Sequence, residues 1–275
     1  MTDENGQKIL ITGADGMVGS YINFGVKTDI ATLDITNEHA VKEAFEKYQP
    51  EVVIHMAAET DVDKCEKDPS HAYKINTLGT YFVAVFARKY NAKMVYISTS
   101  AVFDGKSQKP YYEDAVPNPQ SVYARTKYLG EMIVKDIIPN YLIVRAGWMF
   151  GGGPKKDKKF VAKMIKQLDL PEINVTNDVM GGLTFAKDLI EGIQNLLKEN
   201  KTGTYHLVNK GLCSRYEIAS EITKLLKPSV HIVPVSSDYF ADAVIRGNET
   251  IASHTNTMRS WQEALKEYIA TEWKN

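Results

Sequence analysis

A tyrosine and a lysine lie four residues apart in the segment 121–137, whose apolar spacing is that of a helix. Tyr123 and Lys127 would therefore share one face of that helix. A phenol has an unperturbed pKa of about 10, and a neighbouring ammonium lowers it by favouring the phenolate. Such a pair can give a proton to a carbonyl oxygen near neutral pH. The alternative is an exposed surface pair, so the interpretation depends on the rest of the chain.

Three hydroxyl-bearing residues end an apolar run that precedes this pair. Ser98, Thr99 and Ser100 lie at the end of a strand predicted over 93–98. In a parallel sheet, ligands bind at the carboxyl ends of the strands. Thr99 lies 24 residues before Tyr123, and we expect its hydroxyl to face the same site.

Glycines follow the first predicted strand, which covers residues 8–13. Gly13, Gly16 and Gly19 have the spacing G-x-x-G-x-x-G and open a segment that we expect to be helical. Glycines in this position permit a tight turn and let a pyrophosphate approach the backbone at a helix N-terminus. Three such glycines also occur in ordinary loops. Their place after the first strand of an alternating chain predicts dinucleotide binding.

An acidic residue about 20 positions beyond the first glycine commonly binds the adenosine ribose of a dinucleotide. Asp34 lies 21 residues beyond Gly13, at the end of a second strand predicted over 30–36. The alternative is a turn or capping aspartate ahead of the helix predicted over 38–48. Lys27 is the only basic residue between Gly19 and Asp34. This favours NAD over NADP, and both remain open.

The order of the predicted elements indicates the fold class. Strands at 8–13, 30–36, 51–58, 93–98 and 141–148 alternate with helices at 38–48, 76–90 and 121–137. This alternation predicts an α/β protein with a Rossmann-like, doubly wound parallel sheet. We expect residues 1–146 and about 182–204 to form the dinucleotide-binding domain. A smaller α/β substrate-binding lobe would then contain about 147–181 and 205–275.

These motifs together resemble the extended branch of the short-chain dehydrogenase/reductases. Five stretches are similar to the dTDP-4-dehydrorhamnose reductase family within that branch, at 55–80, 98–105, 111–127, 143–150 and 203–219. The similarity extends over nearly the whole chain. It implies reduction of the 4-keto group of a nucleotide-activated deoxy sugar, expected to be dTDP-linked, by NADPH or NADH.

The resemblance also implies a role for individual residues. Thr99 would bond the keto oxygen, Tyr123 would be the general acid, and Lys127 would bond the nicotinamide ribose and tune Tyr123. Asn76 would hold a helix distortion and a water near Lys127. The implied cofactor-binding residues are Gly13, Gly16, Met17, Val18, Gly19, Asp34, Ile35, Ala57, Ala58, Thr60, Asn76, Tyr123 and Lys127. The implied substrate-binding residues are Val62, Ser100, Ala101 and Trp148, although Trp148 can also be a core residue.

Departures from the family pattern leave the substrate open. Ser100 and Ala101 stand where the reductases have Asp-Tyr, residues 178–184 lack a glutamine and a proline, and Arg246–Gly247 replaces Arg-Pro. Ser100 and Ala101 also argue against a 4,6-dehydratase, because neither can supply the acid and base that its chemistry needs. A 4-epimerase with tightly bound NAD remains an alternative, as does a non-catalytic Rossmann subunit that regulates a partner enzyme.

Charge and composition exclude some classes of protein. The 275 residues carry a net charge of −1, which gives no electrostatic case for nucleic acid or an anionic membrane. The run Lys155, Lys156, Lys158 and Lys159 is a local basic patch, for which a solvated loop is the ordinary interpretation.

Other features of the composition point to a cytoplasmic protein without a metal. Two cysteines and six scattered histidines show no metal-ligand spacing, and the cysteines are expected to be free thiols. The start of the chain has no signal-peptide pattern, and no apolar run reaches the length of a membrane span. A homodimer is possible, but the sequence does not decide it.

Overall fold

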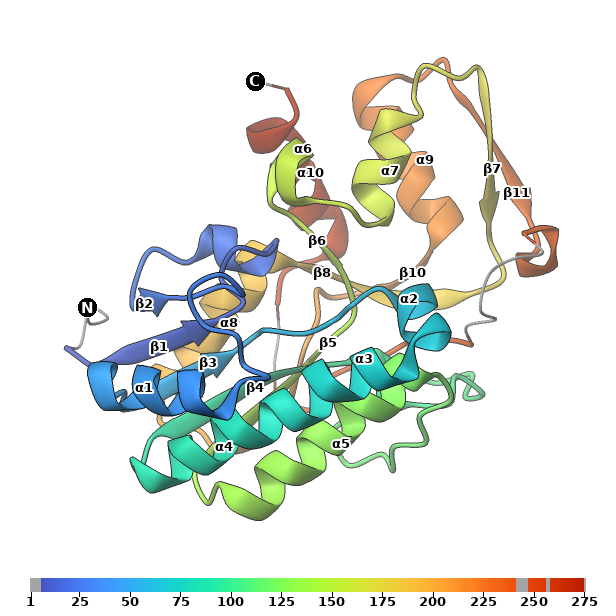
Figure 1. The fold of residues 1–275 in the computed structure, drawn as a ribbon. Helices are drawn as coiled ribbons and strands as arrows, with labels where there is room; N and C mark the ends of the chain where they lie inside the picture. The colour runs from blue at the N-terminus through green and yellow to red at the C-terminus, as the bar shows by residue number, and fades with distance from the viewer. Residues whose placement is uncertain (1–5, 241–246, 256–257, 275) are drawn as a thin grey trace.

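The computed structural model describes residues 6–240, 247–255 and 258–274 (Figure 1). Its centre is a six-stranded sheet in the order β2–β1–β3–β4–β5–β9, and every neighbouring pair in it is parallel. The strands are β1 (Ile9–Thr12), β2 (Val26–Lys27), β3 (Val52–His55), β4 (Lys93–Thr99), β5 (Tyr141–Ala146) and β9 (Gly203–Leu207). The predicted parallel sheet is therefore confirmed.

Helices cover both faces of this sheet. On one face α1 (Glu38–Tyr48), α4 (Thr80–Lys89) and α5 (Val122–Ile137) share a core with inward side chains such as Leu10 and Val53. On the other face α8 (Ala186–Lys198) packs on Ile9 and Ile11. Adjacent residues of β1 serve different cores because successive side chains of a strand point to opposite faces. The fold is the predicted doubly wound, Rossmann-like α/β class.

The prediction of a second strand over 30–36 is wrong. The second strand is the two-residue β2, which ends before Asp29. The Asp29 carboxylate accepts hydrogen bonds from the backbone N–H groups of Ala31 and Thr32 and from the Thr32 hydroxyl, a turn that ends extended backbone. Leu33 and Ile35 are apolar because they enter the core beside α1 and α4, which explains the misleading pattern.

The helix expected after the glycines is reduced to a single turn. Only η1 (Val18–Tyr21), a 3₁₀ turn of four residues, lies between β1 and β2. Six residues separate Gly19 from Val26, which is too few for several helical turns and a connection. The Tyr21 hydroxyl accepts from Gly152 N at 2.6 Å and donates to Glu272 Oε1 at 2.5 Å. This short turn is therefore held by two residues that lie more than 100 positions further along the chain.

The remaining elements build a second layer of sheets and helices. β6 (Trp148–Phe150), β8 (Met180–Phe185) and β10 (Leu212–Ser214) form a three-stranded sheet, and β7 (Glu172–Thr176) pairs with β11 (His231–Val235). Around them lie α6 (Gly153–Lys156), α7 (Phe160–Lys166), α9 (Arg215–Leu226), η4 (Ser237–Tyr239) and α10 (Trp261–Glu272). Phe150, Phe185 and Tyr268 lie in their common core.

The connection between β3 and α4 contains the short helices α2 (Val62–Lys67) and α3 (Pro69–Tyr73) and the π-helical segment η2 (Lys74–Gly79). The turn η3 (Ser100–Val102) follows β4. The predicted division into two domains stays a prediction. Hydrogen bonding places β8 in the three-stranded sheet and β9 in the central one, so the chain passes between the sheets through α8.

Glycine at position 130 sets how closely α5 approaches the sheet. A Cβ there would lie 2.2 Å from Tyr96 Oη. Tyr96 is fully buried, and its hydroxyl donates to Lys127 O, so its ring cannot turn away. We expect Gly130→Ala to lower the free energy of unfolding by about 1–3 kcal/mol, measured by urea denaturation.

Gly192→Ala in α8 is the matched control. Its Cβ would meet only the end of the Leu207 side chain, with 2.9 Å to Cδ1. That side chain can adjust, and alanine favours a helix over glycine by about 1 kcal/mol. The control should therefore keep its stability, and equal losses in the two variants would contradict the proposed role of Gly130.

Candidate active site

The three hydroxyls at the end of β4 have different partners. Ser98 Oγ donates to Glu131 Oε1 at 2.6 Å, and Ser100 Oγ donates to Glu249 Oε2 at 3.0 Å. Thr99 Oγ1 instead accepts from Ala101 N at 3.2 Å. An accepting hydroxyl retains its proton for donation. All three residues are buried, but within the described residues only the two serines donate to carboxylates, so Thr99 is the one suited to bond a ligand oxygen.

Tyr123 and Lys127 lie in the first turns of α5, which packs against β4 and η3. The helix begins where Ser121 Oγ accepts from Ala124 N, and Glu66 Oε1 accepts from Val122 N. Tyr123 is half-buried and Lys127 is buried. The predicted helix with Tyr123 and Lys127 is therefore confirmed, and their joint action with Thr99 stays a prediction.

The Lys127 side chain is buried. Its Nζ is 4.1 Å from the centroid of the Tyr96 ring, a cation–π contact. Burial lowers the pKa of Lys127 to about 7, and the negative charge of Glu131 opposes this shift only in part. Near neutral pH the side chain can be charged or neutral, so a bound ligand can decide which form prevails.

His55, the last residue of β3, connects neighbouring elements of the fold through both ring nitrogens. Its Nδ1 is 2.7 Å from Thr12 Oγ1, and its Nε2 is 3.1 Å from Thr80 Oγ1. Burial, with the Lys127 charge as a second cause, lowers the pKa of His55 to about 3. A neutral imidazole therefore links β1, β3 and α4 without adding a second positive charge beside Lys127.

Asn76 lies in the expected helix distortion. The segment η2 is π-helical, which confirms the predicted irregularity. Asn76 Nδ2 donates to Glu59 O and to Thr126 Oγ1, both at 3.0 Å, and Asn76 Oδ1 accepts from Glu59 N at 2.8 Å. It thereby ties the segment after β3, which contains Ala57 and Ala58, to α5. Its predicted water near Lys127 stays a prediction.

The glycine-rich loop, residues 13–19, fits a phosphate-containing ligand on one side. A Cβ at Gly13 would lie 2.6 Å from the backbone of Ala57, and one at Gly19 would lie 2.1 Å from Ala14 O. These two glycines let the loop pack tightly on the protein. At Gly16 a Cβ would meet only Gly13 O, at 3.4 Å. The loop thus presents an open backbone face at Gly16, where a pyrophosphate can approach.

Trp148, the predicted wall of a sugar pocket, is half-buried at the start of β6. Its ring lies on Gly181, where a Cβ would be 2.5 Å from Cε2, and the Arg215 guanidinium is 5.5 Å from its centroid. The indole N–H is buried and has no partner among the described residues. An unsatisfied buried donor is costly, and a ligand oxygen would satisfy it.

Other predicted residues lie further from the reactive groups. Asp34 accepts from the backbone N–H and hydroxyl of Thr36, as the turn alternative described, while Asn37 caps the helix, and Ile35 packs in the core against Gly79. Met17 and Val18 belong to the short segment at η1, Thr60 is exposed, and Val62 begins α2. Their binding roles stay predictions, and Arg246 lies outside the described residues.

Two residues near the site were missed by the sequence interpretation. Asp29 lies two residues after the end of β2, where a ribose-binding carboxylate belongs, and the short spacing after Gly19 could have indicated it. Glu249 comes beside Ser100 from the far end of the chain, through a bridge between residues 181 and 249. No local pattern could have revealed that contact.

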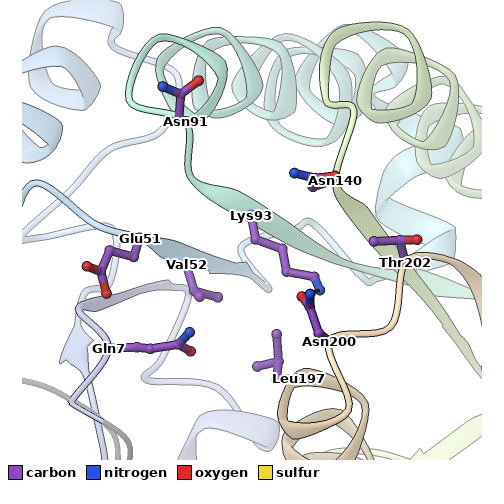
Figure 2. A pocket seen from close by; sticks show the side chains of 9 residues that line it. All are labelled: Gln7, Glu51, Val52, Asn91, Lys93, Asn140, Leu197, Asn200 and Thr202. Atoms are coloured by element: carbon purple, nitrogen blue, oxygen red, sulfur yellow. Dashed lines mark hydrogen bonds between the residues drawn. The ribbon is translucent and has the colours of Figure 1, made fainter.

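A separate pocket of about 200 Å³ lies at the amino ends of β3 and β4 (Figure 2). It is lined by Gln7, Glu51, Val52, Asn91, Lys93, Asn140, Leu197, Asn200 and Thr202. Lys93 Nζ donates to Asn200 Oδ1 across it at 3.0 Å. Because Lys93 and Thr99 are opposite ends of one strand, this pocket is not part of the candidate active site.

The described parts of the chain contain neither a membrane-spanning helix nor a cluster of metal ligands. No helix there is both long and apolar enough to cross a membrane. No three His, Cys, Asp or Glu side chains gather there in a way that would hold a metal. Cys65 and Cys213 are free, buried thiols, and burial raises their pKa values to about 11 and about 12.

The sheet order and the site define a Rossmann-like protein of the dehydrogenase/reductase type. The chain belongs to the RmlD substrate binding domain family, whose model matches residues 7–273. It is 33% identical to the spore coat polysaccharide biosynthesis protein SpsK of Bacillus subtilis, over 95% of this chain and 96% of that protein.

Solved structures of dTDP-4-dehydrorhamnose reductases are similar along almost the whole chain. The Clostridium acetobutylicum protein has a TM-score of 0.90 and 39% identity, covering 96% of this chain and 98% of that one. The Bacillus anthracis protein, in complex with NADP, has a TM-score of 0.91 and 34% identity, covering 98% of this chain and 99% of that one.

A buried ion pair supports the end of β4. Arg145 Nε and Nη2 donate to the two carboxylate oxygens of Glu131 at 2.9 and 2.7 Å, and both residues are buried. We expect Arg145→Met to lower the free energy of unfolding by about 3–5 kcal/mol in urea, because it leaves a buried carboxylate uncompensated. Arg88→Met, at an exposed position in α4, should change stability by less than about 0.5 kcal/mol. A similar small effect at both positions would contradict this account.

The lowered pKa of Lys127 predicts a specific dependence of stability on pH. Between about pH 7 and pH 10 the unfolded chain binds a proton at Lys127 that the folded chain has lost. Stability therefore rises with pH across this range, by up to about 1.4 kcal/mol per pH unit from this group. In Lys127→Met this contribution should be absent. Urea unfolding of both proteins at pH 7, 8 and 9 checks it, and parallel pH profiles would refute it.

Proposed function

We propose that this protein reduces the 4-keto group of dTDP-4-dehydrorhamnose, or of a closely related nucleotide sugar, with NADPH. The observation that supports the proposal is the packing of α5, which carries Tyr123 and Lys127, against β4 and the turn η3 that follows Thr99, in a chain of this family. NADPH would supply a hydride to the keto carbon when bound.

The three residues would divide the remaining work. The Thr99 hydroxyl donates a hydrogen bond to the keto oxygen and positions it. Tyr123 gives its proton to the same oxygen as negative charge develops there. Lys127, in its charged form, favours the Tyr123 phenolate and makes the proton easier to release. Its low exposure strengthens that effect, because water screens the charge little.

The glycine-rich loop and the segment after β3 would hold the cofactor. Gly16 offers an open backbone face, while Ala57 and Ala58 lie between the loop and Asn76. The lean toward NAD from the sequence has no support, because the Bacillus anthracis relative was solved with NADP. We therefore propose NADPH as the first cofactor to test, with NADH beside it.

The other partners expected from the sequence remain to be tested. Trp148, with its unsatisfied indole N–H, is proposed as one wall of the sugar site. Ser100, Ala101 and Val62 are proposed to line the same site. A cytoplasmic location and a homodimer also stay predictions.

The direct test is the oxidation of NADPH, followed by absorbance, with dTDP-4-dehydrorhamnose and other nucleotide 4-keto sugars. Tyr123→Phe should lower kcat by about 10²–10⁴-fold and affect NADPH binding much less, because the lost hydroxyl is the proton donor. Tyr81→Phe, at an exposed position in α4, should keep full activity. An unchanged kcat in Tyr123→Phe would contradict the role of Tyr123 as the proton donor. Conversion of a nucleotide sugar to its 4-epimer without NADPH consumption would contradict the reductase assignment and support an epimerase.

A further inference from the structure

Two lysines of the lysine-rich segment 155–159 contact the glycine-rich loop and the segment after β3 while remaining partly or largely exposed. Lys156 Nζ donates to Asp15 O at 2.7 Å and to Asp15 Oδ1 at 2.5 Å. Lys159 Nζ donates to Thr60 O at 3.3 Å and to Thr60 Oγ1 at 3.2 Å. Lys155 and Lys158 are exposed. Alternate members of the run thus reach the two segments proposed to hold the cofactor.

The backbone of the same region holds Lys156 in place. Gly152, with φ of 78°, donates its N–H to Tyr21 Oη, and a Cβ on it would lie 3.2 Å from Ser20 Oγ. The buried Asp157 carboxylate accepts from Gly151 N, Lys159 N and Tyr268 Oη. The short helix α6 is therefore anchored on both sides, and its last residue is Lys156.

The contact between Lys156 and Asp15 matters for the electrostatic potential at the glycine-rich loop. A full helix after such a loop presents about half a positive charge to a bound pyrophosphate. Here η1 has only four residues, so almost none of that charge is present. Asp15 adds a negative charge, with its side chain 73% exposed. A pyrophosphate at Gly16 would therefore meet an unfavourable electrostatic potential unless a cation compensated for the missing helix charge and for the Asp15 carboxylate.

We propose that Lys156 binds the pyrophosphate of the dinucleotide and replaces the charge that the missing helix would supply. Its ammonium has three donors, and Asp15 accepts two of them, which leaves the third for a phosphate oxygen. A residue of α6, which follows β6 of the three-stranded sheet, would then complete the cofactor site. The proposal rests on the proposed dinucleotide binding and adds a binding residue to it.

The test measures binding rather than turnover. Lys156→Met should weaken NADPH, by fluorescence titration, and ADP, by calorimetry, roughly 10- to 100-fold, as expected for a hydrogen bond between charged groups. Adenosine, which has no pyrophosphate, should bind equally to both proteins. Lys156→Arg should retain most of the affinity. Lys155→Met and Lys158→Met, matched in charge change and exposed, should bind NADPH like the unchanged protein.

Asp15→Asn separates a direct contact from simple neutralisation of Asp15. If Lys156 contacts the pyrophosphate, Lys156→Met still weakens ADP at least tenfold in the Asp15→Asn background. If the loss disappears in that background, or if Lys156→Met binds NADPH as tightly as the unchanged protein, the proposal is wrong. Failure of the unchanged protein to bind NADPH or NADH at all would instead contradict the proposed function.

Discussion

The burial of one lysine constrains the whole face of the sheet that carries α4 and α5. Lys127 lies against the ring of Tyr96, and a charged group in such a place is unfavourable unless its surroundings are arranged for it. Gly130 lets α5 come close enough for the contact, and the neutral His55 avoids a second charge. Glu131, one turn further along α5, partly offsets the burial.

The same arrangement connects the chemistry to the stability of the fold. Glu131 is held by Arg145 from β5 and by the Ser98 hydroxyl from β4. Of the three hydroxyls at the end of β4, this network uses one and Glu249 uses another. The Thr99 hydroxyl, in contrast, has no carboxylate partner among the described residues and accepts from Ala101 N, which leaves its proton for the proposed hydrogen bond to the substrate. A polar network of this kind is stable only when every member is paired.

The other end of the site departs from the usual dinucleotide-binding design. A single 3₁₀ turn stands where a helix commonly follows the glycines, and Tyr21 ties that turn to Gly152 and Glu272. The region around α6 thereby becomes part of the glycine-rich loop's surroundings. In the proposed cofactor site, the positive charge that one local helix usually provides would come from Lys156, far along the chain from the glycines.

The sequence alone determined the alternating parallel sheet, the helix that carries Tyr123 and Lys127, and the hydroxyls at the end of β4. Apolar periodicity and i, i+4 spacing are local, so they can be read without knowing the fold. It misplaced the second strand at 30–36, because Leu33 and Ile35 are apolar for contacts made with α1 and α4. Only the tertiary structure decided which of the three hydroxyls has no carboxylate partner in the described part of the chain, how deeply Lys127 is buried, and that Lys156 forms a salt bridge with Asp15. Those outcomes depend on residues such as Glu249 and Lys156, which lie more than 100 positions from their partners. No local pattern specifies such pairs, because they form only when the elements pack.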